Sequence, residues 1–140
     1  MDSEPEYFDA SPSAAFLMES IRDCGYTIET AIADLIDNSI TAESQNIEIL
    51  LINDENGNPM LSIEDDGVGM TQIELVQAMK LCSKDRYQTR SKNDLGRFGM
   101  GLKTASLSQC RQLTVESNMN GQSTSMTWDL DDLQKMDDWK

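Results

Sequence analysis

Two stretches of strand-like sequence, each interrupted by an Asn-Gly pair, constrain the fold of this chain most. In the first stretch, apolar residues alternate over 47–53 and resume over 60–64, with Asn56-Gly57 in the turn between them. In the second, the alternation over 113–115 is followed by Asn120-Gly121, and residues 123–130 would pair back. Asn-Gly between two strand patterns is a strong short-range signal for an antiparallel hairpin. The sequence therefore predicts two hairpins.

Helical patterns precede and separate these hairpins. Thr71 followed by Glu74 is a capping-box signature, which marks the start of one helix. The predicted helices begin at Ala14, near Thr27, at Thr71 and at Gly101. This order of helices and hairpins favours an α+β fold, a two-layer sandwich in which helices cover one face of a mostly antiparallel sheet.

Composition and charge narrow the classes of function. A chain of 140 residues with 39% hydrophobic content fits one globular domain. The net charge of -14 repels a phosphate backbone, so we expect no direct nucleic-acid binding by this fragment. Histidine is absent, so any general base must be a carboxylate. The three cysteines fit neither a zinc pattern nor a disulfide framework and are expected to be reduced core thiols.

The chain divides into an acidic N-terminal arm over 1–12 and one domain over 13–140. The arm carries no basic leader pattern, and no apolar run reaches membrane length, so a cytoplasmic protein without a membrane segment is expected. Residues 83–94 are polar and aperiodic, which is typical of a mobile loop and suggests a lid beside a site. The last ten residues lack a helix stop signal, so we expect the domain to be incomplete at its C-terminus.

Three short motifs carry the candidate chemistry, and they occur in a fixed order. The first is Ala33-Asp34-Leu35-Ile36-Asp37-Asn38 on a helix, where Asp34 and Asn38 share one face. The second is Asp65-Asp66-Gly67-Val68-Gly69-Met70 after a strand, and the third is Gly96-Arg97-Phe98-Gly99-Met100-Gly101 before a helix. Each motif alone is weak, because short glycine motifs often mark only turns. Together they suggest a divided nucleotide site.

At these residues the chain resembles the gyrase, heat-shock chaperone, histidine kinase and MutL ATPases, whose nucleotide site is called the Bergerat fold. The resemblance covers roughly residues 14–118. Three runs, GYTIETAIADLIDNSITA, IEDDGVGM and DLGRFGMGLKTAS, look closest to the microrchidia-like and prokaryotic stand-alone branch. The resemblance implies Mg²⁺ and ATP as the bound groups.

The resemblance also assigns roles to residues of the first two motifs. Asn38 would be the magnesium residue, because its amide oxygen is a hard ligand. Asp34 would orient and deprotonate the attacking water, although relatives usually carry the longer glutamate there. Asp65 would accept the amino hydrogen of adenine, which favours ATP over GTP. Gly67 and Gly69 would let the backbone approach the base, and Met70 would contact it.

In the third motif, backbone N–H groups of the loop formed by Gly96, Arg97, Phe98, Gly99, Met100 and Gly101 would bind phosphates, and Lys103 could touch the terminal phosphate. Without the resemblance, a plain hinge is the alternative interpretation of the loop, and a solvated charge is the alternative for Lys103. Relatives often have an Asp-Ala pair where this chain has Thr41-Ala42. Their adenine-binding threonine and distal phosphate-binding lysine have no recognisable match before Lys140.

These observations favour Mg²⁺-dependent ATP binding with slow hydrolysis, acting as a nucleotide-gated conformational switch within a larger protein. An ATP-dependent homodimer through the full-length protein is a further expectation from the resemblance. A regulatory module that binds ATP or ADP without turnover is the alternative, because Asp34 is shorter than the usual glutamate. A histidine-kinase catalytic domain is a weaker option that would require a partner to supply the phosphoacceptor.

Overall fold

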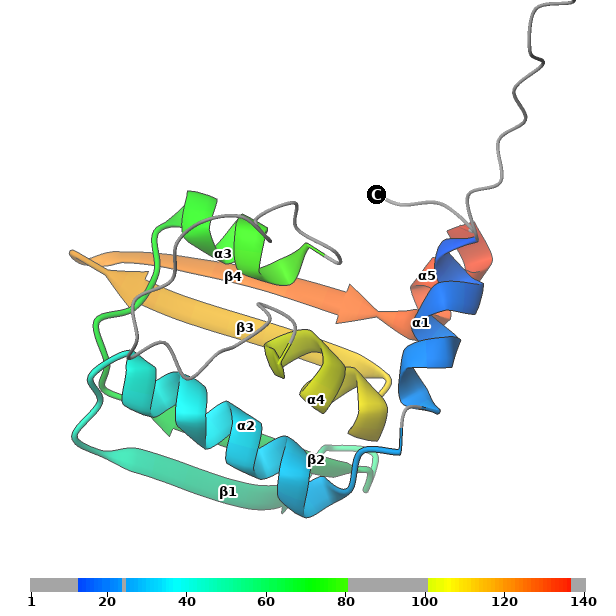
Figure 1. Cartoon of the computed structure of the whole chain (residues 1–140), viewed down its shortest axis with the longest axis horizontal. Coiled ribbons are helices and arrows are strands. Elements are labelled where there is room, and N and C mark those ends of the chain that lie inside the picture. The colour runs from blue at the N-terminus through cyan, green and yellow to red at the C-terminus, as the bar shows by residue number, and fades with distance from the viewer. Residues whose placement is uncertain (1–12, 24, 81–100, 137–140) are drawn as a thin grey trace, which may run out of the picture.

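The computed structural model describes residues 13–23, 25–80 and 101–136, and its helices and strands follow the predicted order (Figure 1). The elements are α1 (Ala14–Arg22), α2 (Ile28–Thr41), β1 (Ile47–Asn53), β2 (Pro59–Asp65), α3 (Gln72–Met79), α4 (Gly101–Gln109), β3 (Gln112–Met119), β4 (Gln122–Asp129) and α5 (Leu130–Met136). The predicted α+β class is confirmed. The predicted arm over 1–12, the predicted lid and residues 96–100 of the glycine loop lie outside the described residues.

The first three helices begin at side-chain caps that satisfy backbone N–H groups left without an intrahelical partner. Ser13 accepts a hydrogen bond from the Phe16 N–H at the start of α1, and Thr27 accepts one from Thr30 at the start of α2. At α3 the predicted capping box is present in both directions between Thr71 and Glu74. Local capping chemistry therefore sets these three helix starts.

The strands form two antiparallel hairpins, as the Asn-Gly pairs predict. β1 pairs with β2 from Ile47 opposite Asp65 to Asn53 opposite Pro59. β3 pairs with β4 in the same antiparallel sense. Asn120 and Gly121 both have positive φ, 54° and 77°, which a tight hairpin turn requires. Within the described residues the two hairpins are separate two-stranded sheets, without a hydrogen-bonded ladder between them.

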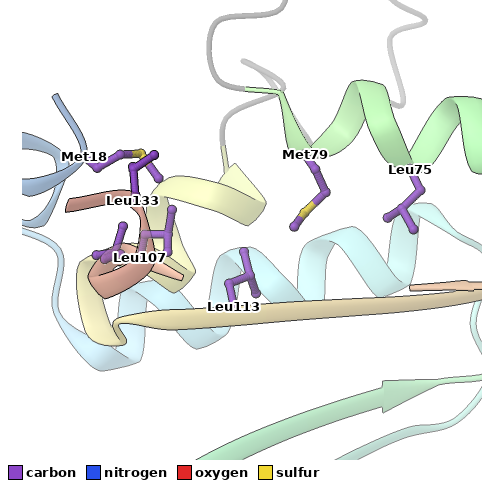
Figure 2. Packing of buried hydrophobic residues seen from close by; sticks show 7 residues of the cluster. Met18, Leu75, Met79, Leu107, Leu113 and Leu133 are labelled. Carbon is purple, nitrogen blue, oxygen red and sulfur yellow. The ribbon is translucent and has the colours of Figure 1, made fainter. Parts of the chain in front are cut away.

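The core lies where α3 and α4 pack on the β3–β4 hairpin, and α1 and α5 close one end (Figure 2). Its buried residues are Met18, Leu75, Met79, Leu107, Leu113, Leu130 and Leu133. The Trp128 indole N–H of β4 donates a hydrogen bond of 2.8 Å to the Met79 carbonyl at the end of α3. Burial of each apolar side chain of this core contributes about 1.5–3 kcal/mol to the free energy of unfolding. This core fixes α3 and α4 on the same hairpin.

Helix α2 is held against the core indirectly. It packs against α4, and Ala31 is its buried apolar residue. At the far end of α4, the Arg22 guanidinium of α1 donates to the carbonyls of Leu107 and Cys110, at 3.3 and 2.6 Å. These bonds satisfy acceptors that a helix C-terminus leaves unpaired. Helix α4 is therefore the element that joins α1, α2 and the β3–β4 hairpin.

The β1–β2 hairpin exposes apolar side chains on both of its faces. Leu51 is 74% exposed and its neighbour Ile52 is 44% exposed, and consecutive strand residues point to opposite faces. On β2, Met60 is 44% exposed. Among the described residues, helix packing is therefore concentrated on the other hairpin. No described helix is long and apolar enough to cross a membrane.

Candidate functional site

Helix α2 carries two of the predicted site residues on one face. Asp34 and Asn38 are one turn apart, and both side chains are half-buried. The Asp34 carboxylate is not isolated, because its Oδ2 accepts a hydrogen bond of 2.8 Å from the Tyr26 hydroxyl. Asp37, on the same helix, is exposed. The helix therefore presents one tethered carboxylate and one amide along a shared face.

The third predicted residue, Asp65, is joined to the end of this helix. The Ser39 hydroxyl donates to Asp65 Oδ2 at 2.6 Å, and the Gly67 N–H donates to Asp65 Oδ1 at 2.9 Å. Partial burial raises the pKa of Asp65, but the hydrogen bonds from Ser39 and Gly67 outweigh it and hold the pKa below its ordinary value. Asp65 is therefore an ionised hydrogen-bond acceptor that contacts Ser39, the residue after Asn38.

Ser39 contacts the candidate site through Asp65, and sequence reasoning missed it. It is 2% exposed, and its only recognisable signal was its position directly after Asn38. Its partner lies 26 residues away on β2, so no local pattern reveals the contact. The contact matters because it links the helix of the first motif to the carboxylate of the second.

The two acidic residues of the second motif have different partners. Asp66 accepts hydrogen bonds from the backbone N–H groups of Gln45 and Asn46 and from the Asn46 side chain. Hydrogen bonds from Asn46, followed by that from the Gln45 N–H, lower the pKa of Asp66 below its ordinary value. Asp66 thus stabilises the turn before β1, and Asp65 is the acidic residue of this motif that contacts α2.

Gly67 is required by close packing against the end of α2. A Cβ at Gly67 would lie 2.7 Å from the Ala42 side chain, the Ala42 carbonyl oxygen and the Ser44 hydroxyl. Next to it, the Val68 N–H donates to the same Ala42 carbonyl at 2.9 Å. Gly67 therefore lets the loop after β2 meet the helix that carries Asp34 and Asn38.

Gly69 and Met70 connect the same loop to β3. Gly69 has φ of 74°, and a Cβ there would lie 2.1 Å from the Asn118 carbonyl oxygen. The Met70 N–H donates to the Ser117 hydroxyl at 2.7 Å, and the Met70 side chain packs against the core. These contacts explain both residues as packing residues. The predicted contacts of Gly69 and Met70 with a base stay predictions.

The structure places Lys103 in the interior. Its side chain is 1% exposed, and its Nζ donates to the Lys80 carbonyl at the end of α3. The lysine thus joins α4 to α3 in this arrangement, and a phosphate contact would require the side chain to move. Gly101 begins α4, as the third motif predicts, whereas Gly96, Arg97, Phe98, Gly99 and Met100 lie outside the described residues.

The residues of the candidate site fit a magnesium ion that takes most of its ligands from water and from the phosphates of a nucleotide. In the described ranges, no three Cys, Asp or Glu side chains gather so that they could hold a metal ion. Mg²⁺ commonly keeps several waters and takes one or two protein oxygens plus substrate phosphates. The Asn38 amide oxygen, on the same face as Asp34, has the chemistry of such a ligand.

Comparison with known proteins identifies the family that this chain matches. Residues 26–140 match the family described as "Histidine kinase-, DNA gyrase B-, and HSP90-like ATPase". The chain is 29% identical over 97 residues to ATPase morc-1 of Caenorhabditis elegans, a match that covers 69% of this chain and 11% of that protein. It is 33% identical over 97 residues to Protein MICRORCHIDIA 7 of Arabidopsis thaliana, covering 65% and 13%.

A bacterial protein gives a match of similar extent. The chain is 31% identical over 94 residues to the DNA mismatch repair protein MutL of a Thermoanaerobacter species, covering 64% of this chain and 15% of that protein. In each of these comparisons the matched part is a small share of the relative's length. Because the family match spans well over half of the chain, this chain belongs to the histidine kinase-, DNA gyrase B- and HSP90-like ATPases, the family that its three motifs resemble.

Proposed function

We propose that this domain binds ATP together with Mg²⁺, hydrolyses it slowly, and so acts as a nucleotide-gated switch in the intact protein. One observation carries the proposal: the Ser39 hydroxyl bonds Asp65, and this brings the second motif onto the helix of Asp34 and Asn38. Family membership supports adenine nucleotide as the ligand. The coupling of ATP to a homodimer is part of the same proposal.

Asp65 would select adenine. Ser39 and Gly67 stabilise the ionised carboxylate, and an ionised carboxylate can only accept hydrogen bonds. It would therefore attract the exocyclic amino group of adenine and repel the carbonyl oxygen that guanine has at the corresponding place. This reasoning supports ATP rather than GTP as the nucleotide.

Asn38 and Asp34 would act at the phosphates. The Asn38 oxygen would be the protein ligand of magnesium, which when bound neutralises phosphate charge. Asp34, one turn earlier, would accept a proton from the attacking water. Backbone N–H groups of residues 96–101 would offset phosphate charge, as the third motif predicts. This use of backbone donors suits a protein whose net charge is -14.

A non-hydrolysing ATP- or ADP-binding module is the second candidate, and two observations favour it. Asp34 is one methylene shorter than the glutamate usual in relatives, and a misplacement of about 1 Å can lower a rate by about 100-fold. Lys103 is buried on the Lys80 carbonyl. Binding and turnover must therefore be measured separately.

Calorimetric titration of the intact protein with ATP and GTP, each with and without Mg²⁺, tests binding. Asp65→Asn should lose most ATP affinity, whereas Asp66→Asn is the matched control because Asp66 bonds the turn before β1. Asn38→Ala should weaken binding with Mg²⁺ more than binding without it. Equal affinity for ATP and GTP in the wild-type protein would contradict the adenine assignment.

Release of phosphate from isotopically labelled ATP tests turnover. Asp34→Asn should abolish most of the release, and Asp37→Asn, an exposed carboxylate on the same helix, is the control. If wild-type protein binds ATP but Asp34→Asn releases phosphate as fast as wild type, the base assignment is wrong. Tight binding without any turnover would favour the second candidate.

A further inference from the structure

Tyr26 contacts the proposed base although it lies outside all three motifs. It is the residue before Thr27, the N-cap of α2, and its hydroxyl donates to Asp34 Oδ2 at 2.8 Å. At about 1.5 Å of rise per residue, Asp34 lies roughly two turns along the chain from Tyr26, so the two side chains must extend toward each other along the helix to make this contact. Both side chains are half-buried.

The backbone of Tyr26 is held from another direction. Gln109, the last residue of α4, donates from its side-chain amide to the Tyr26 carbonyl at 2.9 Å. Helices α2 and α4 also pack against each other. The tyrosine is thus fixed at its main chain by α4 while its hydroxyl is directed onto α2.

We propose that Tyr26 is a positioning residue for Asp34, an inference that rests on the proposed function. A phenol hydroxyl that donates to Oδ2 restricts rotation of the carboxylate and leaves Oδ1 to accept the proton of water. Because the aspartate is shorter than the usual glutamate, its reach toward water depends on orientation, and the tyrosine supplies that restraint.

The test combines Tyr26→Phe, Asp34→Asn and the double variant in the intact protein. Tyr26→Phe keeps the ring and removes only the hydroxyl, so kcat for ATP should fall about 10- to 100-fold. KM and the ATP affinity measured by calorimetry should stay within about twofold of wild type, because a residue that orients the base acts on the attacking water and not on nucleotide binding. Thr114→Val, which removes an exposed hydroxyl of the β3–β4 hairpin, is the control.

A positioning role predicts that the two changes are not additive. In the Asp34→Asn background, Tyr26→Phe should lower kcat no further, since the tyrosine acts through the aspartate. Urea unfolding of the same four proteins without nucleotide gives a readout independent of activity. In the urea experiment, the effect of the double variant on the unfolding equilibrium constant should differ by about tenfold from the product of the effects of Tyr26→Phe and Asp34→Asn.

Each outcome decides between the alternatives. Wild-type kcat in Tyr26→Phe, with Asp34-dependent turnover intact, would overturn the positioning role and leave the proposed function standing. A parallel loss of ATP affinity, or additive losses of kcat, would show a structural role instead and also overturn it. Absence of any turnover in wild-type protein would overturn hydrolysis itself, whereas turnover that survives Asp34→Asn would overturn only the base assignment. Either result would overturn this inference as well.

Discussion

Three glycines allow strain and steric clash to be measured separately in this protein. Gly57 has φ of 83° and open space where a Cβ would lie, so alanine there meets only the strain of a left-handed backbone. Gly67 has no positive φ but would place its Cβ 2.7 Å from three atoms, so alanine meets only the clash. Gly69 combines φ of 74° with a Cβ 2.1 Å from the Asn118 carbonyl oxygen.

The expected losses in the free energy of unfolding follow from these two contributions. A left-handed backbone costs about 1–2 kcal/mol for a residue with a Cβ. About 0.4–1 kcal/mol of this cost is offset, because alanine restricts the unfolded chain more than glycine does. Gly57→Ala should therefore lose about 1 kcal/mol. Gly67→Ala should lose about 1–3 kcal/mol by overpacking. Gly69→Ala should lose about 3 kcal/mol or more, because the strain of a left-handed backbone adds to a closer clash.

Urea unfolding followed by circular dichroism measures these differences, provided that the slope against urea is unchanged between variants. ATP affinity should be retained in Gly57→Ala and reduced in the other two, since Gly67 and Gly69 hold the loop of Asp65 against α2 and β3. Equal destabilisation of Gly57→Ala and Gly69→Ala would refute the reasoning, because it would mean that the loop does not approach Asn118 as closely as described.

Other perturbations test single contacts. Ser39→Ala should weaken ATP binding by about tenfold in calorimetric titration, because it removes one hydrogen bond to the charged Asp65 carboxylate. Unchanged affinity would remove Ser39 from the site. Thr71→Ala should lose about 1 kcal/mol of stability in urea unfolding by breaking the capping box of α3, and an unchanged midpoint would contradict the cap. Hydrogen bonds from Asn46 and Gln45 lower the pKa of Asp66 in the folded protein. The ionised Asp66 carboxylate therefore stabilises the fold at pH values above its unfolded-state pKa of about 3.9, and this stabilisation is lost as the pH falls through its folded-state pKa. The stability advantage of wild type over Asp66→Asn at about pH 6 should therefore shrink below about pH 4 in urea titrations, and a constant difference would contradict this.

Local chemistry explains why most of the fold was predictable. The turn at Asn120-Gly121 and the capping box at Thr71 each involve residues within four positions of one another, and both form as predicted. The hairpin registers follow from such turns and from the period-2 pattern. The α+β class follows from the order of these elements, which the sequence displays directly.

Contacts between distant residues were not predictable from the sequence. Lys103 has the pattern of an exposed helical lysine, but the packing of α3 beside α4 supplies a carbonyl 23 residues away and buries it. The bond between Ser39 and Asp65 likewise depends on where β2 ends relative to α2. The sequence also did not predict which hairpin the helices pack on, since strand periodicity does not say which element covers a face.

The exposed β1–β2 hairpin has a consequence for the behaviour of the protein in solution. Leu51 and Ile52 lie on a strand whose outer edge has unpaired backbone groups among the described residues, and such an edge invites another strand to pair with it. At neutral pH the charge of -14 keeps molecules apart. Acid neutralises this charge and high salt screens it, so molecules should aggregate through the exposed hairpin under conditions in which the core is still folded.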